Sequence, residues 1–247
     1  MSEALKTRAL VLFRRPLGEA DEIIGLFSPR RGRVDAVARG SKKISSAWVG
    51  KVEPFAELNA MLTPGRQLYY LSQAEMLHSF RGIYQNYGRL CWGSFFLELW
   101  SALPQIEDTA ECEEVYGLIL RTLQTLESSK RFRLLGCWSE WNLLRILGQQ
   151  PFTSSCVRCG SNFLAGYSYT DGGVLCDSCI IKTVQAVYLP RRMLIMLQRL
   201  PFLTSDRAVV AEADATEMRR LEEIVWRHWC ACGLPLVRAR NMVNDLP

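Results

Sequence analysis

Four cysteines in two pairs are the residues of this sequence best suited to chemistry. Cys156 and Cys159 form one Cys-x-x-Cys pair, and Cys176 and Cys179 form a second pair after a gap of 16 residues. Two such turns aim four thiolates at one point, which is the ligand set of a tetrahedral zinc site. The spacing therefore predicts one bound Zn²⁺. A redox dithiol pair and an iron–sulfur cluster are the alternatives.

The number of ligands limits what this metal could do. Four protein thiolates leave no open position for water, and a catalytic zinc ion needs one. We therefore expect a structural ion that stabilises a segment too small and too polar to fold alone. Cys230 and Cys232, with His228 nearby, suggest a second metal site. That pattern is weaker, because residues two apart on a helix point to different faces.

The elements that must position these residues change type along the chain. Before residue 79, short apolar runs rich in β-branched and aromatic residues alternate with turns, which predicts five strands and a small barrel. After His78 the apolar period becomes helical, and we expect helices near 92–103, 115–126, 130–147, 190–200 and 214–229. The spacing of Asp214 and Glu217 is that of a capping box. The fold class is thus α+β, with more than one domain.

We expect four segments along the chain: a barrel over residues 1–79, helices over 80–150, a cysteine module over 151–182, and further helices over 183–247. The cysteine module lies in turns rich in Gly, Ser and Asp, between helical segments. The metal is therefore expected to shape the helical part of the protein. It lies far in sequence from the barrel.

Positive charge is concentrated in one part of the predicted barrel. Residues 28–51 hold seven Arg or Lys residues against Asp35 alone, a charge of +6, while the whole chain carries +5. A local basic surface is typical of proteins that bind a polyanion, and aromatic side chains beside it can stack on bases. Trp48, Tyr69 and Tyr70 are the candidates for stacking. The alternative is a solvated loop. The candidate DNA-binding residues are Arg14, Arg15, Arg33, Arg39, Lys42, Lys43, Lys51 and Arg66.

Several other functions are disfavoured by the sequence. It contains only two histidines and no P-loop, because Gly50-Lys51 is followed by Val52 and lacks the preceding glycine. No apolar run approaches the roughly 20 residues that span a bilayer. The N-terminus lacks the layout of a signal peptide, and nine cysteines do not suit a disulfide framework. We therefore expect a cytoplasmic protein that is not an enzyme.

The order of several short motifs resembles that of the bacterial RecO recombination and repair proteins. The resemblance extends over most of the chain. It is carried by Gly18-Glu19-Ala20-Asp21, Leu26-Phe27-Ser28, Gly32-Arg33-Val34, Ala38-Arg39-Gly40-Ser41-Lys42-Lys43, Gly50, Glu53-Pro54-Phe55, Arg131-Phe132-Arg133-Leu134-Leu135 and the tail from Gly233 to Arg240. It implies an N-terminal OB-fold barrel followed by a helical domain with an inserted zinc module.

The resemblance also implies an activity without bond-making chemistry. RecO proteins bind single- and double-stranded DNA, anneal complementary strands and work with RecR to load recombinase onto strands coated by single-stranded-DNA-binding protein. In the family, the acidic, apolar C-terminal tail of that coating protein docks on the helical domain. Lys130 and Arg131 are the expected cationic rim of the docking groove. The implied location is the nucleoid in the bacterial cytoplasm.

Two other functions remain as alternatives. The first is a zinc-stabilised protein-interaction scaffold that does not bind DNA directly, in which the basic segment only keeps the protein solvated. The second is a zinc hydrolase or nuclease. The closed set of four thiolates argues against it, because the ion would have no position for a reacting water.

Overall fold

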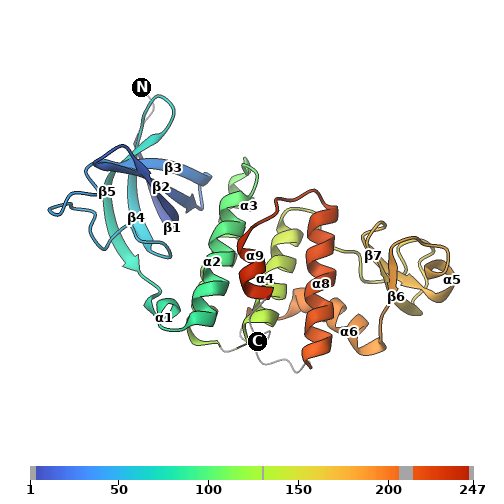
Figure 1. Ribbon diagram of the computed structural model, residues 1–247. Helices are drawn as coiled ribbons and strands as arrows, with labels where there is room; N and C mark the ends of the chain where they lie inside the picture. The colour runs from blue at the N-terminus through green and yellow to red at the C-terminus, as the bar shows by residue number, and fades with distance from the viewer. Residues whose placement is uncertain (1–3, 130, 206–213, 245–247) are drawn as a thin grey trace. The chain divides into compact units, whose positions relative to one another are not determined.

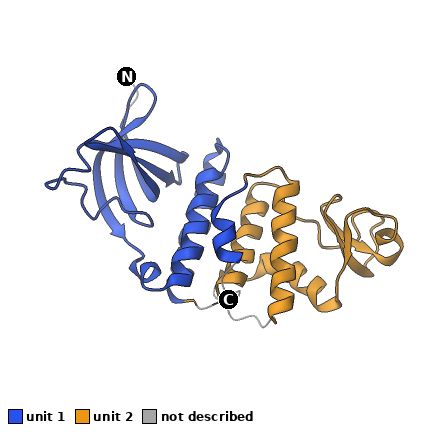
Figure 2. Ribbon diagram, viewed as in Figure 1, with its two compact units in different colours: residues 1–128, 236–247 blue, residues 129–235 orange. Residues whose placement is uncertain are grey.

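The computed structural model describes residues 4–129, 131–205 and 214–244 (Figure 1). The chain divides into two compact units (Figure 2). Unit 1 consists of residues 1–128 and 236–247, and unit 2 consists of residues 129–235. The C-terminal segment therefore folds with the N-terminal part of the chain. None of the helices in the described ranges is both long and apolar enough to cross a lipid bilayer.

Unit 1 begins with a closed five-stranded barrel, as the sequence predicts. Its strands are β1 (Leu5–Leu17), β2 (Asp21–Ser28), β3 (Gly32–Ala38), β4 (Glu57–Pro64) and β5 (Tyr69–His78). They pair in the order β1-β2-β3-β5-β4, and β4 returns to β1. All pairs are antiparallel except β3 with β5, where Ala36 lies beside Tyr69 and Val37 beside Tyr70. This parallel pairing closes the barrel.

The barrel core follows from the alternation of side chains along each strand. In β4, the buried residues Leu58, Ala60 and Leu62 alternate with more exposed ones. Gly25 of β2 is required by close packing, because a Cβ atom there would lie 2.1 Å from the ring of Phe13. Small and branched residues fill the interior: Ala9, Val11, Ile24, Leu26, Val34, Ala36, Ala38, Val52, Ala56, Leu58, Ala60, Leu62 and Leu71.

The helices of unit 1 are α1 (Arg81–Tyr84), α2 (Tyr87–Ala102), α3 (Thr109–Ser128) and α9 (Ala239–Asn244). Helix α2 starts at Asn86, whose side chain accepts a hydrogen bond from the amide of Arg89. The carboxylate of Glu98 accepts hydrogen bonds from the amides of Arg238 and Ala239, at 2.8 and 2.7 Å. These bonds satisfy the start of α9, which explains why the end of the chain packs on α2.

Unit 2 contains three long helical segments and the cysteine module. Its elements are α4 (Phe132–Ile146), β6 (Leu164–Ser168), β7 (Gly173–Cys176), α5 (Asp177–Ile180), β8 (Ala186–Tyr188), α6 (Arg191–Arg199), the 3-10 helix η1 (Leu200–Phe202) and α8 (Ala215–Ala231). The three strands form a sheet in the order β7-β6-β8. The predicted capping box is confirmed: Asp214 Oδ1 accepts from the amide of Glu217 at 2.8 Å, and the reverse bond is 3.2 Å.

Candidate metal centre and nucleic-acid interface

The cysteine quartet is built by two turns that the small sheet holds together. In the first turn, Gly160 donates a backbone hydrogen bond to the carbonyl of Cys156 at 2.8 Å. Gly160 has φ +76°, a left-handed conformation that glycine adopts without strain. In the second turn, Cys176 ends β7 and caps α5, and Cys179 lies in α5. The amide of Val157 donates to the carbonyl of Val174 at 2.9 Å, which joins the first knuckle to β7.

The sulfur positions fit a tetrahedral metal ion. An ion about 2.3 Å from each of four sulfurs places the sulfurs about 3.8 Å apart. The Sγ atoms of Cys159 and Cys176 are 3.6 Å apart. All four Sγ atoms of the quartet lie within 4.8 Å of one another. The chain thus brings together the donor set that the sequence predicts.

Electrostatics at the quartet favour a bound cation. Burial raises the pKa of Cys156, but hydrogen bonds from the backbone amides of Cys176 and Cys159 outweigh it and lower that pKa to about 6. The hydrogen bond with the Cys176 thiol and the other nearby sulfurs raise the pKa of Cys179 to about 12. One thiolate therefore forms readily at neutral pH, whereas four adjacent thiolates require a positive ion among them.

The second cysteine pattern does not form a comparable cluster. Cys232 Sγ lies 3.5 Å from His228 Nε2, whereas Cys230 is exposed. Within the part of the chain that the structure describes, the quartet is the only group of three or more Cys, His, Asp or Glu side chains close enough to share an ion. The His228 ring is instead hydrogen-bonded between Tyr167 and Gln149, at 2.8 Å on each side.

The segment between β3 and β4 carries four of the predicted DNA-binding residues. We call residues 39–51 the basic loop, after Arg39, Lys42, Lys43 and Lys51, all of which are exposed. The loop is fixed to the turn between β1 and β2. Lys42 Nζ donates to the carbonyl of Gly18 at 2.8 Å, and the amide of Gly40 donates to Asp21 Oδ1 at 2.7 Å. Its cations are thus presented from a hydrogen-bonded scaffold.

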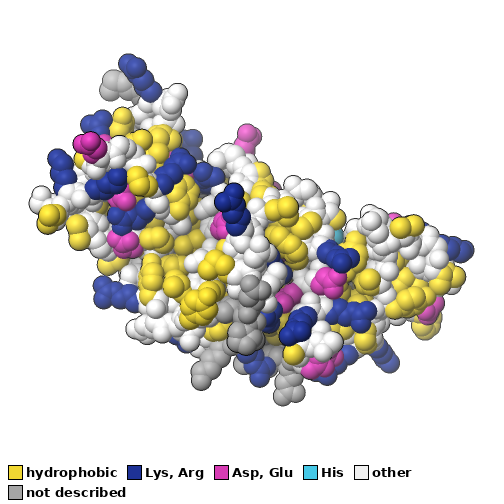
Figure 3. Space-filling model, viewed as in Figure 1, with side chains coloured by type: hydrophobic (Ala, Val, Ile, Leu, Met, Phe, Trp, Pro, Cys, Tyr) yellow, Lys and Arg dark blue, Asp and Glu magenta, His cyan; other side chains and the backbone are white. Residues whose placement is uncertain are grey.

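The cations of the basic loop differ in how they are used within the protein. The guanidinium of Arg39 lies 4.4 Å from the centre of the Tyr70 ring, in cation–π contact. The ammonium groups of Lys43 and Lys51 have no hydrogen bond or ion pair with any described residue. These two lysines are therefore fully available to a polyanion. On the face drawn in Figure 3, Lys and Arg side chains are visible over the barrel.

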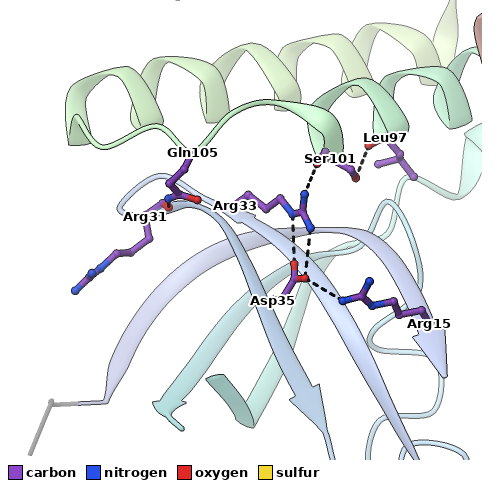
Figure 4. Close-up of polar contacts among 7 residues, drawn as sticks. All are labelled: Arg15, Arg31, Arg33, Asp35, Leu97, Ser101 and Gln105. Carbon is purple, nitrogen blue, oxygen red and sulfur yellow. Dashed lines mark hydrogen bonds and ion pairs between the residues drawn. The ribbon is translucent and has the colours of Figure 1, made fainter. Parts of the chain in front are cut away.

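Two other predicted DNA-binding residues, Arg15 and Arg33, make contacts inside unit 1 (Figure 4). Arg33 Nη1 donates to the carbonyl of Ser101 at 2.6 Å, at the end of α2, and its Nε lies 3.4 Å from Asp35 Oδ1. Arg15 Nη2 lies 3.5 Å from Asp35 Oδ2. Arg33 therefore fastens the barrel to α2, which no local sequence pattern indicates.

Arg14 and Arg66 differ in exposure and in their contacts. Arg14 is ion-paired with Glu53 and with Glu22, the latter at 2.7 Å. Arg66 is exposed in the turn between β4 and β5, just before Tyr69. The turn that holds Arg66 lies against the Tyr70 ring, because a Cβ atom on Gly65 would be 2.8 Å from it. The Arg39 guanidinium of the basic loop contacts the same ring.

The predicted stacking residues are largely part of the barrel. Trp48 and Tyr69 pack against the barrel core, and Trp48 Nε1 donates to the carbonyl of Arg39 at 3.0 Å. Tyr70 is covered by the Arg39 guanidinium. These aromatic rings stabilise the base of the loop.

Unit 2 contains an apolar pocket with arginines around it. Its volume is about 520 Å³. Nine residues from α4, α6, η1, α8 and adjoining turns line it: Leu134, Arg191, Arg192, Ile195, Met196, Arg199, Leu200, Leu203 and Leu221. We call it the arginine-rimmed pocket. Its three cations come from α6, which the sequence predicts as a helix but not as a binding surface.

The structure describes one of the two predicted rim residues, Arg131. Lys130 lies outside the described residues. Arg131 is exposed at the start of α4, and its amide donates to Ser129 Oγ at 2.9 Å. Leu134, one turn further along α4, lines the arginine-rimmed pocket. The predicted rim and the arginine-rimmed pocket therefore both involve α4. The helical spacing of Arg191, Arg192 and Arg199 around the exposed Ile195 is the sequence signal that could have indicated the part of the pocket formed by α6.

Comparison with known proteins identifies relatives for nearly the whole chain. Residues 1–80 match the family model for the Recombination protein O N terminal part, and residues 84–232 match the model for the Recombination protein O C terminal part. The DNA repair protein RecO of a Nocardioides species is 30% identical over 230 residues, which cover 89% of this chain and 91% of the relative.

Two further relatives have the same description. The DNA repair protein RecO of Symbiobacterium thermophilum is 31% identical over 198 residues, covering 77% of each chain. That of a Roseiflexus species is 29% identical over 231 residues, covering 90% of this chain and 80% of the relative.

Proposed function

The chain belongs to the RecO family of DNA repair proteins, and from this premise we propose that it is a DNA-binding recombination mediator. It binds single- and double-stranded DNA and anneals complementary strands. Together with RecR, it helps to load recombinase onto strands coated by single-stranded-DNA-binding protein. The protein acts by binding and makes or breaks no covalent bond. Its site of action is the nucleoid in the bacterial cytoplasm.

The observation that carries this proposal is the basic loop on the barrel. Arg39, Lys42, Lys43 and Lys51 are exposed on a loop that hydrogen bonds hold in place. Cations of this kind bind phosphates without reading sequence, and the affinity comes largely from released counterions. Fixing the loop in advance lowers the ordering cost of binding. The predicted contact is therefore with the DNA backbone, and it weakens steeply with added salt.

Lys43 and Lys51 provide the sharpest test, because neither side chain has a partner among the described residues. We expect the double variant Lys43→Glu/Lys51→Glu to fold normally and to bind DNA more weakly. The slope of the logarithm of its binding constant against the logarithm of salt concentration should be smaller in magnitude by about two. The control is Arg121→Glu/Arg219→Glu, which changes the charge equally at exposed positions on α3 and α8. Fluorescence anisotropy of labelled DNA at several salt concentrations measures both. Equal losses in the two double variants would overturn the loop's role.

We propose that the ion in the cysteine quartet is Zn²⁺ with a structural role. Four thiolates with one tetrahedral arrangement suit zinc and leave no position for substrate. Its ligands Cys156, Cys159, Cys176 and Cys179 join the first knuckle to the sheet and α5. The ion when bound supplies folding energy to unit 2. The basic loop belongs to unit 1, whereas the quartet belongs to unit 2.

The arginine-rimmed pocket is the proposed docking site for the tail of single-stranded-DNA-binding protein. The tail is acidic and apolar, and the pocket offers the complementary chemistry. Leu134, Leu200 and Leu221 provide an apolar floor, while Arg191 and Arg199 provide positive charge without an acidic residue in the lining. Arg192 is also ion-paired with Glu217 at 3.4 Å. Burying an apolar side chain next to a charge-assisted hydrogen bond gives both affinity and orientation.

A further inference from the structure

The basic loop exposes two β-branched apolar residues, Ile44 and Val49, and Ile44 is the more exposed of the two. Ile44 is fully exposed. It occupies the second position of a β-turn closed by the hydrogen bond from the amide of Ser46 to the carbonyl of Lys43, at 2.9 Å. Such corners favour Pro, Gly, Asn, Asp and Ser, whereas a β-branched apolar residue gains nothing there. A role outside the folded chain is therefore indicated.

The loop presents Ile44 from a sequence of hydrogen-bonded turns. Backbone bonds join Lys43 to Gly40, Ser46 to Lys43, Val49 to Ser46 and Lys51 to Trp48, at 3.1, 2.9, 3.3 and 3.0 Å. The anchor of Lys42 on Gly18 fixes the same loop to the barrel. A β-branched side chain also has few rotamers, so Ile44 loses little entropy when it is buried by a ligand.

The charges around Ile44 identify the chemistry of its partner. Lys42 and Lys43 precede it directly, and both ammonium groups are exposed. An apolar tip beside two cations fits a ligand whose apolar surfaces adjoin anionic groups, and stacked bases next to phosphates have that arrangement. DNA-binding proteins insert Ile, Leu, Met or Phe side chains between bases in this way.

The aromatic residues of the loop do not compete for this role. Trp48 and Tyr69 pack on the barrel core, and Tyr70 lies beneath Arg39. Proteins that bind single strands usually stack bases on exposed aromatic rings. Here, the fully exposed Ile44 is the side chain of the loop best placed to touch bases.

We propose that Ile44 is a wedge that inserts between neighbouring bases of a bound DNA strand while Lys42 and Lys43 hold the adjacent phosphates. The inference rests on the proposed DNA binding and deepens it. A wedge at this position separates stacked bases and leaves their pairing edges free, which suits a protein that brings complementary strands together. It also predicts that Ile44 affects base stacking more than it affects affinity.

The test uses the full-length protein and a single-stranded oligonucleotide of adenine and 2-aminopurine, whose fluorescence rises when the bases unstack. Anisotropy of an end label measures binding separately. We expect the wild type to raise the 2-aminopurine fluorescence. Ile44→Ser should bind about fivefold more weakly with an unchanged salt slope, and it should lose most of the fluorescence rise. Ile44→Leu, which keeps an apolar tip, should retain the rise.

Val49→Ser is the matched control, because Val49 is 64% exposed on the same loop and also holds the second position of a β-turn, closed by the bond from the Lys51 amide to the Trp48 carbonyl, but no lysine directly precedes it. It should keep the fluorescence rise. A full rise with Ile44→Ser, or an equal loss with Val49→Ser, would overturn the wedge. If the wild type binds the oligonucleotide without any rise, the wedge is wrong and DNA binding stands. If the wild type does not bind at all, the proposed function fails as well.

Discussion

At the scale of single residues, the pKa shifts within the cysteine quartet match a site that holds a cation. The amides around Cys156 lower its pKa to about 6, while the neighbouring sulfurs raise the pKa of Cys179 to about 12. Without an ion, Cys179 therefore keeps its proton at neutral pH, and all four sulfurs become thiolates only around a bound cation. The proposed metal supplies folding energy, so losing one ligand should weaken both metal binding and the stability of unit 2.

Replacement of Cys176 tests this coupling. In Cys176→Ser we expect loss of bound zinc and a decrease of about 3 kcal/mol or more in the free energy of unfolding of unit 2. Zinc content by atomic absorption and chemical denaturation measure the two effects. Cys230→Ser, at an exposed cysteine outside the quartet, should change neither. A Cys176→Ser protein with full zinc content would contradict the proposed ligand set.

The second residue-scale feature is the buried His228. The Gln149 carbonyl can only accept, so Nε2 carries the proton and Nδ1 accepts from the Tyr167 hydroxyl. Burial lowers the pKa of His228 below its ordinary value of 6.5. As the pH falls below about 6.5, the unfolded chain binds a proton that the folded protein resists. The stability from neutral His228 is therefore present above that pH and is lost as the pH falls through the folded-state pKa.

Comparison with His228→Gln isolates this dependence. The variant is expected to be less stable at pH 7.5, but its free energy of unfolding should fall less between pH 7.5 and about 5.5 than that of the wild type. Urea denaturation at the two pH values measures the difference. Proton competition at the cysteine quartet affects both proteins, so it cancels in the comparison. Parallel pH dependence in the two proteins would show that His228 does not titrate in this range.

At the scale of elements, contacts distant in sequence decide which cations are available. The sequence marks residues 28–51 as basic, but it does not reveal that Arg33 bonds to Ser101 on α2 or that Gln105 Nε2 donates to the carbonyl of Arg31 at 3.0 Å. Both contacts join the β2–β3 region of the barrel to the end of α2 and the segment after it. Lys43 and Lys51 remain available because the loop that carries them extends beyond these contacts.

The long elements were predictable, because their apolar periods extend over many residues. This holds for the barrel strands, for α2 to α4, and for α8 with its capping box. The short elements β6, β8, α1 and α9 have too few residues to display a period. Helix α9 depends on Glu98, which lies 140 residues away in sequence from Arg238. The arginine-rimmed pocket was missed for the same reason, since α4, α6 and α8 form it jointly.

The pocket provides the prediction at this scale. Arg199→Glu places a negative charge in the lining, and we expect it to weaken binding of a peptide with the acidic, apolar C-terminal sequence of single-stranded-DNA-binding protein by about tenfold or more. Isothermal titration calorimetry measures the affinity. Arg219→Glu changes the charge equally on an exposed part of α8, outside the pocket lining. It should bind the peptide nearly normally. Comparable weakening by both would point to general charge attraction.

At the scale of the whole molecule, the two compact units carry different candidate sites. Unit 1 holds the barrel and its basic loop, while unit 2 holds the cysteine quartet and the arginine-rimmed pocket. The four-cysteine cluster was predictable to the residue, because Cys-x-x-Cys spacing encodes a local geometry. The exposed basic surface was predictable as a region only, because ion pairs and cation–π contacts within the fold determine which of its cations face solvent. The proposed function needs both units, since a mediator must hold DNA and recognise the protein that coats it.

Annealing of complementary strands by the full-length protein tests this account most directly. Two labelled complementary oligonucleotides are mixed without ATP, bare or coated with single-stranded-DNA-binding protein, and pairing is followed by energy transfer between the labels. We predict that the protein accelerates pairing in both cases. Lys43→Glu/Lys51→Glu should lose the acceleration on bare and coated strands, whereas Arg199→Glu should lose it only on coated strands. No acceleration by the wild type on either substrate would contradict the account.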